Sequence, residues 1–427
     1  MTRSASASVP ADPDLAHCLV VGILAGGMGW GIRGQYGHQT GAMMAGLLVC
    51  LGIGALLGRP LSSLQMARAV ALGAIGMAFG GSQTYGQTVG LTHDAELRGN
   101  WPALAWGMAG LALKGALWVG FSGALLGMGL SRVRYRAREI ALLFWVLIAL
   151  MLLGMALLNQ PYDLEQRRLP LLYFSATWDW FPNKPDLRPR FENWGGLFAA
   201  LAALVYYVAR VRRDRLAGRL ALFGIGFGAL GFPLGQSIQA WHAWNPALFR
   251  QDGPLSPLDT TVNWWNTMEI TFGAVLGGGL ALGAWCGRSE IGPKEGEAEP
   301  ALSAGLEWLW LGLHPALLIA WEFQEFRAVE GFAGLALPFW AMPVLAVLLG
   351  RRFPYALCLP LVALPIAGKT LREMCYKSSD IAVPLGWILF AVLPLVLLSL
   401  AARAAYRRAA QGEPGEHFAA RTLILAA

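Results

Sequence analysis

The sequence predicts an all-α protein that crosses a membrane about 12 times, and three observations predict it. Of the 427 residues, 56% are hydrophobic and only 14% are charged, whereas a soluble domain is about 25% charged. Apolar stretches of about 20 residues, the length that crosses the hydrocarbon core of a bilayer, recur along the whole chain. The 53 glycines and 18 tryptophans are also typical of membrane helices, which pack through small residues and carry aromatic residues at the water interface.

Lysines and arginines indicate the orientation of these spans, because short cytoplasmic loops carry an excess of them. The predicted spans are 17–32, 40–57, 67–87, 102–130, 139–158, 196–211, 219–240, 263–286, 306–323, 332–350, 353–369 and 383–402. With the N-terminus inside, 20 of the 33 Lys and Arg residues fall on the cytoplasmic side and 12 on the outer side. We therefore expect both termini in the cytoplasm and a multi-pass protein of a bacterial-type plasma (inner) membrane.

Two long polar connections divide the chain. Residues 1–286 are expected to form an eight-helix membrane region, 287–303 a cytoplasmic linker, 304–402 a four-helix membrane region and 403–427 a mobile cytoplasmic tail. The polar segment 159–194 lies outside in the predicted orientation and should fold as a cap over the outer face.

A weak internal repeat relates the third and fourth predicted spans to the seventh and eighth. Each copy has an outgoing helix that ends in Gly-Gln and a returning helix rich in small residues. The matched residues are Gly76, Gly81, Gly86, Gln87 and His93 in the first copy and Gly226, Gly231, Gly235, Gln236 and His242 in the second. A partial copy with Gly34, Gln35 and His38 covers the first two spans. Equivalent helices run in the same direction, so the repeat is parallel.

Polar side chains attached to this repeat are the candidate substrate-binding residues. Polar groups left unsatisfied at membrane depth cost several kcal/mol each, so they indicate a polar cavity that opens to the outside. The alternative is that they are interfacial groups solvated by headgroups and water. The candidates are Arg33, Gln35, His38, Gln83, Gln87, His93, Gln236, Gln239, Trp241, His242, Asn245 and Asn266.

Lys114 and Glu269 are charged residues inside predicted spans. Such charges are costly in a bilayer and often have a function, so both are candidate coupling groups. Because their helices occupy equivalent places in the repeat, we expect an ion pair between them. The alternative places Glu269 near the outer surface, paired with Arg33 or a loop.

The remaining patterns exclude several kinds of partner. The histidines show no short metal-ligand spacing, so we expect no metal and no other cofactor. The arginines are divided among short loops at a membrane surface, which excludes nucleic acid and leaves membrane lipids and a small-molecule or lipid-linked substrate as partners.

Three functions remain open at this point. A transporter of a small polar or anionic solute fits the many spans, the parallel repeat and the intramembrane charges best. A membrane-embedded transferase that acts at the outer face on a lipid-linked saccharide or another lipid is the first alternative, and a non-catalytic scaffold subunit is the second.

Overall fold

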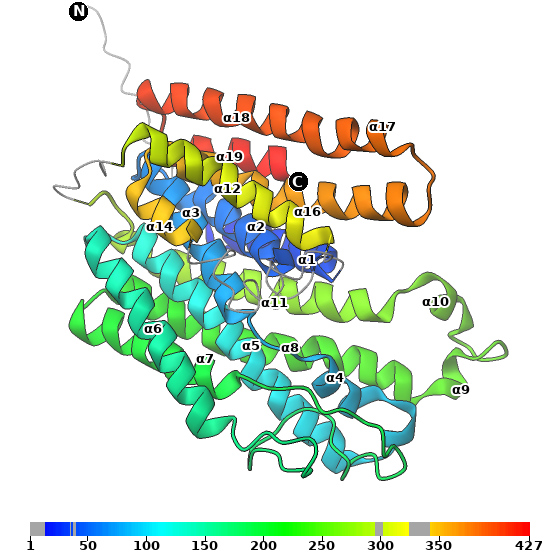
Figure 1. Ribbon diagram of the computed structural model, residues 1–427. Helices are drawn as coiled ribbons and strands as arrows, with labels where there is room; N and C mark the ends of the chain where they lie inside the picture. The colour runs from blue at the N-terminus through cyan, green and yellow to red at the C-terminus, as the bar shows by residue number, and fades with distance from the viewer. Residues whose placement is uncertain (1–12, 35, 37–39, 295–301, 324–341) are drawn as a thin grey trace, which may run out of the picture.

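The computed structural model describes residues 13–34, 36, 40–294, 302–323 and 342–427. Within these residues the protein is all-helical and contains no β-strand (Figure 1). Nine helical segments of the described chain are long and apolar enough to cross a membrane. The protein is therefore a membrane-embedded helical protein, as its composition predicts.

Short connections join most of the helices. The first half contains α1 (Leu15–Arg33), α2 (Thr40–Leu57), α3 (Ser63–Gly80), α4 (Gly86–His93), η1 (Ala95–Leu97), α5 (Trp101–Leu130), α6 (Ala137–Leu158), α7 (Trp194–Tyr206) and η2 (Tyr207–Val211). The second half contains α8 (Arg215–Trp244), α9 (Pro246–Phe249), α10 (Ser256–Thr261), α11 (Trp264–Cys286), η3 (Arg288–Glu290), α12 (Ala304–Phe323), α14 (Met342–Leu349), α15 (Phe353–Cys358), α16 (Pro360–Leu371), η5 (Arg372–Lys377), α17 (Val383–Trp387), η6 (Ile388–Val392), α18 (Leu393–Ala410) and α19 (Gly415–Ala426).

The span-length helices overlap nine of the twelve predicted spans, the first eight and the last. The predicted ninth span corresponds to α12, whereas the predicted eleventh is divided between α15 and α16. This division follows from Pro360, which lacks the amide that would continue α15. The predicted tenth span, 332–350, lies mostly outside the described residues, and only α14 belongs to it.

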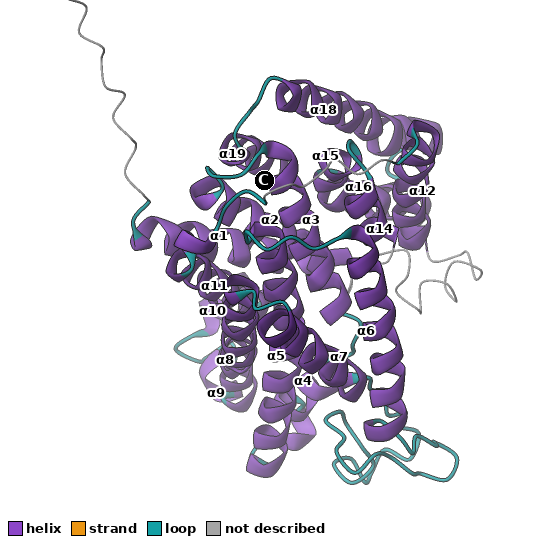
Figure 2. Cartoon of the chain, turned by 90° about the vertical axis from the view of Figure 1, so that its left-hand side faces the viewer, coloured by secondary structure: helices purple, strands orange, loops and turns teal. Residues whose placement is uncertain are grey.

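Six helices form a closed ring in the order α1, α2, α3, α5, α8 and α11, with α11 packed against α1. Figure 2, which looks at the bundle from one end, shows the six arranged in this order. The pair α6 and α7 packs outside α5, while α14, α15 and α16 pack against α2 and α3. The ring is thus the centre of the molecule, and the later helices surround part of it.

Glycines allow the ring helices to touch backbone to backbone. A Cβ atom added to Gly228 of α8 would lie 2.7 Å from the carbonyl carbon of Gly115 of α5. One added to Gly76 of α3 would lie 2.7 Å from the carbonyl oxygen of Phe121. Because no side chain fits at these points, small residues set the spacing of the ring.

Aromatic side chains fill the interior of the ring. Trp30 of α1 packs edge-to-face on Trp118 of α5 at 5.1 Å and on Phe272 of α11 at 4.6 Å between ring centroids. Phe272 in turn stacks on Phe232 of α8 at 4.6 Å. All four side chains are at most 1% exposed. We call Trp30, Trp118, Phe232 and Phe272 the aromatic plug.

The connections gather at two ends of the bundle, on the left and right of Figure 1. The left end holds segments 131–138 and 210–215, which Ser131 and Asp214 join through a 2.6 Å hydrogen bond. We call it the arginine-rich end. The right end holds α4, α9 and α10 together with segment 159–193, and we call it the cap end. Residues expected on one side of the membrane therefore lie at one end of the bundle.

The end of the chain differs from the mobile tail that its composition predicts. Residues 415–426 form α19, which packs against α2 and α3. Phe418 and Ala419 are buried in this contact, whereas Ile424 is 77% exposed. One face of α19 therefore packs on the ring, and a second apolar face, with Ile424, points away from it. The pattern of a short amphipathic helix was present in the sequence but was too weak to indicate docking.

Candidate functional site

Helix α4 organises the polar residues of the cap end. The predicted third span was expected to run to Gln87, but α3 ends at Gly80, and Gly81 caps it with its amide bonded to the carbonyls of Met77 and Ala78. Residues 81–85 then turn, and α4 begins at Gly86. This short helix presents Thr88 and Thr92, one turn apart, to the buried side.

The expected Gly-Gln helix ends are therefore wrong for two of the three copies. Gly86 and Gln87 begin α4, and Gly235 and Gln236 lie within α8, which continues to Trp244. Glycine breaks a helix only weakly, and α8 continues through this region although Pro233 within it lacks an amide donor. In the partial copy Gly34 does cap α1, while Gln35 lies outside the described residues.

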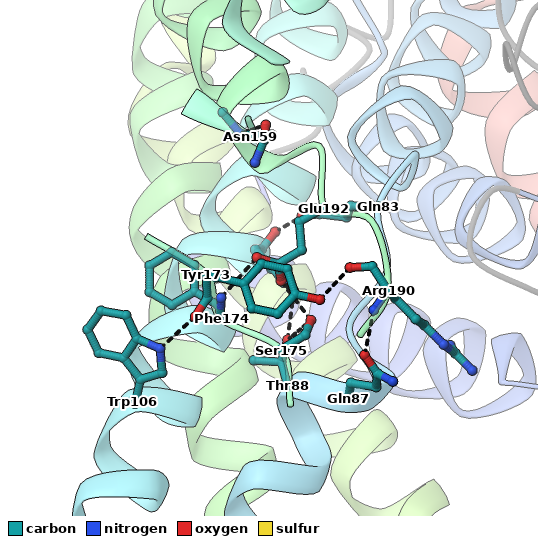
Figure 3. A network of polar contacts seen from close by, with 12 residues as sticks. Gln83, Gln87, Thr88, Trp106, Asn159, Tyr173, Phe174, Ser175, Arg190 and Glu192 are labelled. Atoms are coloured by element: carbon teal, nitrogen blue, oxygen red, sulfur yellow. Dashed lines mark hydrogen bonds and ion pairs between the residues drawn. The ribbon is translucent and has the colours of Figure 1, made fainter. Parts of the chain in front are cut away.

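Lys114 pairs with Glu192, and the expected Lys114–Glu269 pair is not formed. Lys114 Nζ lies 2.7 Å from a Glu192 carboxylate oxygen and donates a 2.6 Å hydrogen bond to the Thr88 hydroxyl. Glu192 also accepts from the Ser175 hydroxyl at 2.7 Å and from the Phe174 amide at 2.9 Å (Figure 3). Both charged side chains are 1% exposed. Every partner of this pair except Thr88 comes from segment 159–193, which the repeat does not include.

The depth of Lys114 explains how a loop reaches it. Lys114 precedes Leu130, the last residue of α5, by 16 residues, which is about 24 Å of helix. A hydrocarbon core is about 30 Å thick, so a core that began at Leu130 would end within a few residues of Lys114, and the 30-residue helix α5 is long enough to extend beyond it. The Lys114 charge is neutralised by Glu192 of segment 159–193, which gathers at the same end of the bundle.

Gln87 of α4 also fastens segment 159–193. Its side-chain amide donates to the Arg188 carbonyl at 2.9 Å and accepts from the Arg190 backbone amide at 2.8 Å. Within the segment, the Tyr173 hydroxyl donates to the Arg190 carbonyl at 2.5 Å. Burial, with the Glu192 carboxylate nearby, raises the pKa of the Tyr173 phenol, so this group remains a neutral donor. Gln87 is thus a clamp for the cap segment.

Glu269 occupies a separate place, one helical turn from the aromatic plug toward the cap end. Its Oε1 accepts hydrogen bonds of 3.1 Å from both the Tyr85 hydroxyl and the Trp265 indole. A Cβ atom on Gly34 would lie 3.0 Å from the Glu269 carboxyl carbon. Tyr85 precedes Gly86 and packs on Phe232 of the plug at 5.2 Å. The carboxylate, 1% exposed, therefore lies between the end of α1 and the start of α4.

The glutamines of the site supply buried acceptors. Gln236 donates to the Thr92 hydroxyl at 2.7 Å, and Gln83 donates to the carbonyls of Gly80 and Lys114 at 2.8 and 3.0 Å. The carbonyl oxygens of Gln83, Gln236 and Gln239 accept no hydrogen bond from the described residues. These three residues are 5%, 0% and 6% exposed, respectively. Three buried acceptors are therefore left without a donor by the described residues.

His93 ends α4 close to the same cluster. Its Nδ1 lies 2.9 Å from the Val89 carbonyl, which can only accept, so Nδ1 carries the proton in neutral His93. Nε2 is then the basic nitrogen. The imidazole centroid lies 6.4 Å from the ring of Trp265, the same side chain that donates to Glu269.

Four predicted site residues lie in or beside the α8–α11 connection, where their given hydrogen bonds are to residues of that region. His242 bonds to Asp259 at 2.7 Å and stacks on Trp264, while Trp241 is 47% exposed. The Asn245 side chain donates to the Trp241 carbonyl. The backbone amide of Asn266 donates to the side-chain oxygen of Asn263, which caps α11. These contacts stabilise turns. The side chain of Arg33, like Gln35 and His38, lies outside the described part of the structure.

The sequence predictions missed Tyr85, Thr88, Ser175 and Glu192. A lysine within a span requires a carboxylate, and this requirement was the available signal for Glu192. Internal symmetry favoured Glu269 instead, because segment 159–193 has no periodicity that predicts its path. In the described chain, no three His, Cys, Asp or Glu side chains are close enough to hold a metal ion.

Protein-family models, curated proteins and solved structures were all compared with the chain, and none of them matches it. The geometry of the chain itself therefore carries the functional argument.

Proposed function

We propose that the protein is a multi-pass membrane transporter of a small polar solute, which binds at the cap end of the six-helix ring. One observation carries this proposal: three buried glutamine oxygens accept nothing from the described chain, and the buried Glu269 carboxylate lies in the same half of the ring. Buried acceptors are costly unless a donor reaches them. A solute rich in O–H or N–H groups, such as a polyol or an amine, fits this set better than an anion.

The ring supports transport as well as binding. We infer that the hairpins α1–α2, α3–α5 and α8–α11 are three copies of one unit, since each contributes two neighbouring helices to the ring. Between hairpins, contacts such as Gly228–Gly115 join smooth backbone surfaces, along which packed helices can slide by small steps. Such sliding would part the aromatic plug and open the path toward the arginine-rich end.

Lys114 is no longer the favoured coupling group in this proposal. Its charge is satisfied by Glu192, Thr88 and the buried cap segment. Glu269 is the better candidate for a coupling group. It lies against Gly34 at the end of α1 and accepts from Tyr85, which follows α3, so it can respond both to the solute and to a movement of these hairpins. We place the protein in a bacterial-type inner membrane with the cap end outside, as the arginine distribution predicts.

Solute uptake into proteoliposomes tests the proposal. Glucose, myo-inositol and putrescine are suitable probes of donor-rich solutes, and inorganic phosphate is the anionic comparison. We expect uptake of at least one donor-rich probe and a decrease of about 10–100-fold for Glu269→Gln, since a hydrogen bond to a charged group contributes about 1.5–3 kcal/mol. Asn266→Ala should transport like the wild type, because the hydrogen bond given for Asn266 uses its backbone amide, which the substitution keeps. Equal uptake by Glu269→Gln and the wild type would contradict the assignment of the site.

The depth of the site favours a second candidate, a transferase that acts on a lipid-linked saccharide at the cap end. Every polar group of the cluster lies on the cap side of the aromatic plug, and sugar hydroxyls would satisfy the same glutamine oxygens. Background uptake of all probes, combined with release of sugar from an added lipid-linked saccharide, would favour this candidate. Uptake that depends on Glu269 would exclude it.

A further inference from the structure

A hollow of about 460 Å³ opens at the arginine-rich end, where the span-length segments Trp194–Val211 and Arg215–Trp244 adjoin. Val205 of α7 and Ala209 of η2 line one wall, and the first turns of α8 line the other. Because one span ends and the next begins here, the hollow lies where the hydrocarbon core meets the lipid headgroups.

Three arginines line this hollow, and two of them have no partner within the described chain. Arg210 and Arg215 are exposed, and none of the described carboxylates pairs with either of them. Arg219 differs, because it donates to the Cys286 carbonyl at 3.2 Å and lies 3.6 Å from a Glu290 carboxylate oxygen. The free positive charge of the hollow therefore comes from Arg210 and Arg215.

The carboxylate in the lining, that of Asp214, is occupied by donors of the chain. One of its oxygens accepts from the Ala217 amide at 2.9 Å, and the other accepts from the Ser131 and Tyr135 hydroxyls at 2.6 and 2.8 Å. The Asp214 side chain is 1% exposed. Two exposed cations thus outweigh one buried carboxylate, and the hollow attracts anions.

The position of Arg215 favours a ligand over a role in helix stability. Arg215 is the first residue of α8, where the helix dipole disfavours a positive charge. Asp214 already caps this end of the helix through the Ala217 amide. An anion bound in the hollow would reverse the balance, because the arginine and the helix start then attract the same charge.

An apolar track continues from the hollow along α8. Leu222, which lines the hollow, and Leu230 are 62% and 64% exposed, and they follow Arg215 on one side of the helix. Between them, a Cβ atom on Gly226 would meet nothing within 4 Å. The helix rises about 22 Å from Arg215 to Leu230, which exceeds one leaflet, about half of the 30 Å core. The charged hollow is thus followed by an exposed apolar surface as long as an acyl chain.

We propose that this hollow binds the headgroup of an anionic phospholipid, with an acyl chain of the same lipid along α8. Basic pockets between membrane helices bind such headgroups on the cytoplasmic side, which is the side expected for the arginine-rich end. The guanidinium groups of Arg210 and Arg215 suit the phosphodiester oxygens. The apolar track favours a lipid over a soluble anion, which would contact the arginines alone. The site is independent of the transport proposed for the cap end.

Thermal unfolding of the purified full-length protein in detergent micelles, followed by tryptophan fluorescence, tests the site. The probe is phosphatidylglycerol, with phosphatidylcholine as the uncharged control and glycerol phosphate as a headgroup without acyl chains. The variants are Arg210→Gln and Arg215→Gln, and the matched control is Arg138→Gln, which removes an exposed arginine from the same end but outside the hollow. Each hollow variant should need about fivefold more phosphatidylglycerol for a half-maximal shift, since one arginine is removed from the lipid surface.

We expect phosphatidylglycerol to raise the unfolding temperature of the wild type and of Arg138→Gln at the same lipid concentration. Without lipid, Arg215→Gln should unfold at the wild-type temperature or slightly above it, because the substitution removes a cation that opposes the helix dipole. The proposal is overturned if phosphatidylglycerol acts no more strongly than phosphatidylcholine, or if the hollow variants respond like the wild type. It is also overturned if Arg138→Gln loses the shift as much as they do, which indicates unspecific attraction, or if glycerol phosphate gives the same shift, which assigns the hollow to a soluble anion.

Discussion

Lys114 shows how a full charge is accommodated next to the hydrocarbon region. Its ammonium group has the Glu192 carboxylate and the Thr88 hydroxyl as partners, and Glu192 is bonded in turn to Ser175 and to the Phe174 amide. A buried ion pair is stable when both charges have such additional hydrogen bonds. The pair therefore fastens segment 159–193 to α5 and α4.

Replacing one partner of this pair should be costly. Lys114→Met leaves a buried carboxylate without its counter-charge, which lowers the free energy of unfolding by about 3–5 kcal/mol. The double variant Lys114→Met/Glu192→Gln removes both charges. Its amide oxygen keeps an acceptor for the Phe174 amide and its NH2 group can donate to the Ser175 hydroxyl, so the variant should recover much of the loss. The free energy of unfolding in detergent, measured for the wild type, Lys114→Met, Glu192→Gln and the double variant, gives the coupling energy of the pair. Additive effects of the two substitutions would contradict a direct pair.

The sequence predicted which residues of the site carry intramembrane charge, but not their partners. Lys114 and Glu269 stand out because their helices are otherwise apolar. Their neighbours depend on the path of residues 81–85 and 159–193, where the chain has no periodic pattern. Tyr85 and Glu192 therefore could be assigned only from the fold. Surface residues such as His242 looked equivalent to His93 because the repeat gives them matching positions, whereas Asp259 holds His242 in a turn.

At the scale of elements, the glycines of α5 and α8 determine how closely the ring can pack. Gly228 has no room for a methyl group, whereas a Cβ atom on Gly226 of the same helix would meet nothing within 4 Å. The two positions thus separate the effect of packing from the effect of helix propensity. Both substitutions replace glycine by a better helix former, which contributes about 0.5–1 kcal/mol in favour of the helix.

Gly228→Ala should lower the unfolding temperature of the protein, while Gly226→Ala should leave it unchanged or raise it slightly. The added methyl group of Gly228→Ala forces the backbone of α8 away from Gly115, and overpacking of this kind costs about 1–3 kcal/mol. Thermal unfolding in one detergent, measured side by side, compares the two variants. The same response from both would mean that close approach of α5 and α8 does not stabilise the ring.

The strongest helices were predicted well because their apolar length alone identifies them. The weaker elements were not. The span expected at 67–87 is divided into α3 and α4 by a turn that Gly81 caps, and the tail expected to be mobile is the docked helix α19. In both places a few specific contacts, which propensity does not contain, decide the structure. Phe418, for instance, is an ordinary tail residue in the sequence but is 1% exposed in the fold.

At the scale of the whole molecule, the ring explains why polar residues distant in the sequence meet. Helices α1 and α11 are neighbours because the ring closes between them. This closure brings Gly34 against Glu269, while the short α4 brings Tyr85 to the same carboxylate. A ring built from hairpins can therefore collect one polar group from each unit at its cap end. The distribution of charge along the sequence predicts which side of the membrane this end faces.

That orientation can be tested on either side of a single helix. Arg138 is exposed at the start of α6, and Leu171, 97% exposed, lies in the cap segment that follows the same helix. In a background with the exposed Cys286 replaced by serine, a membrane-impermeant maleimide should label Leu171→Cys in intact cells. It should label Arg138→Cys only after the membrane is permeabilised, because segments 131–138 and 210–215 are rich in arginine and arginine is retained in the cytoplasm.

The 22 residues of α6 extend about 33 Å, enough to separate the two sites by one bilayer. The reverse labelling pattern would invert the protein in the membrane and place the Glu269 cluster inside. Labelling of both variants in intact cells would mean that α6 does not cross the membrane. In that case α7 could not cross either, because α6 and α7 together connect α5 to α8 of the ring.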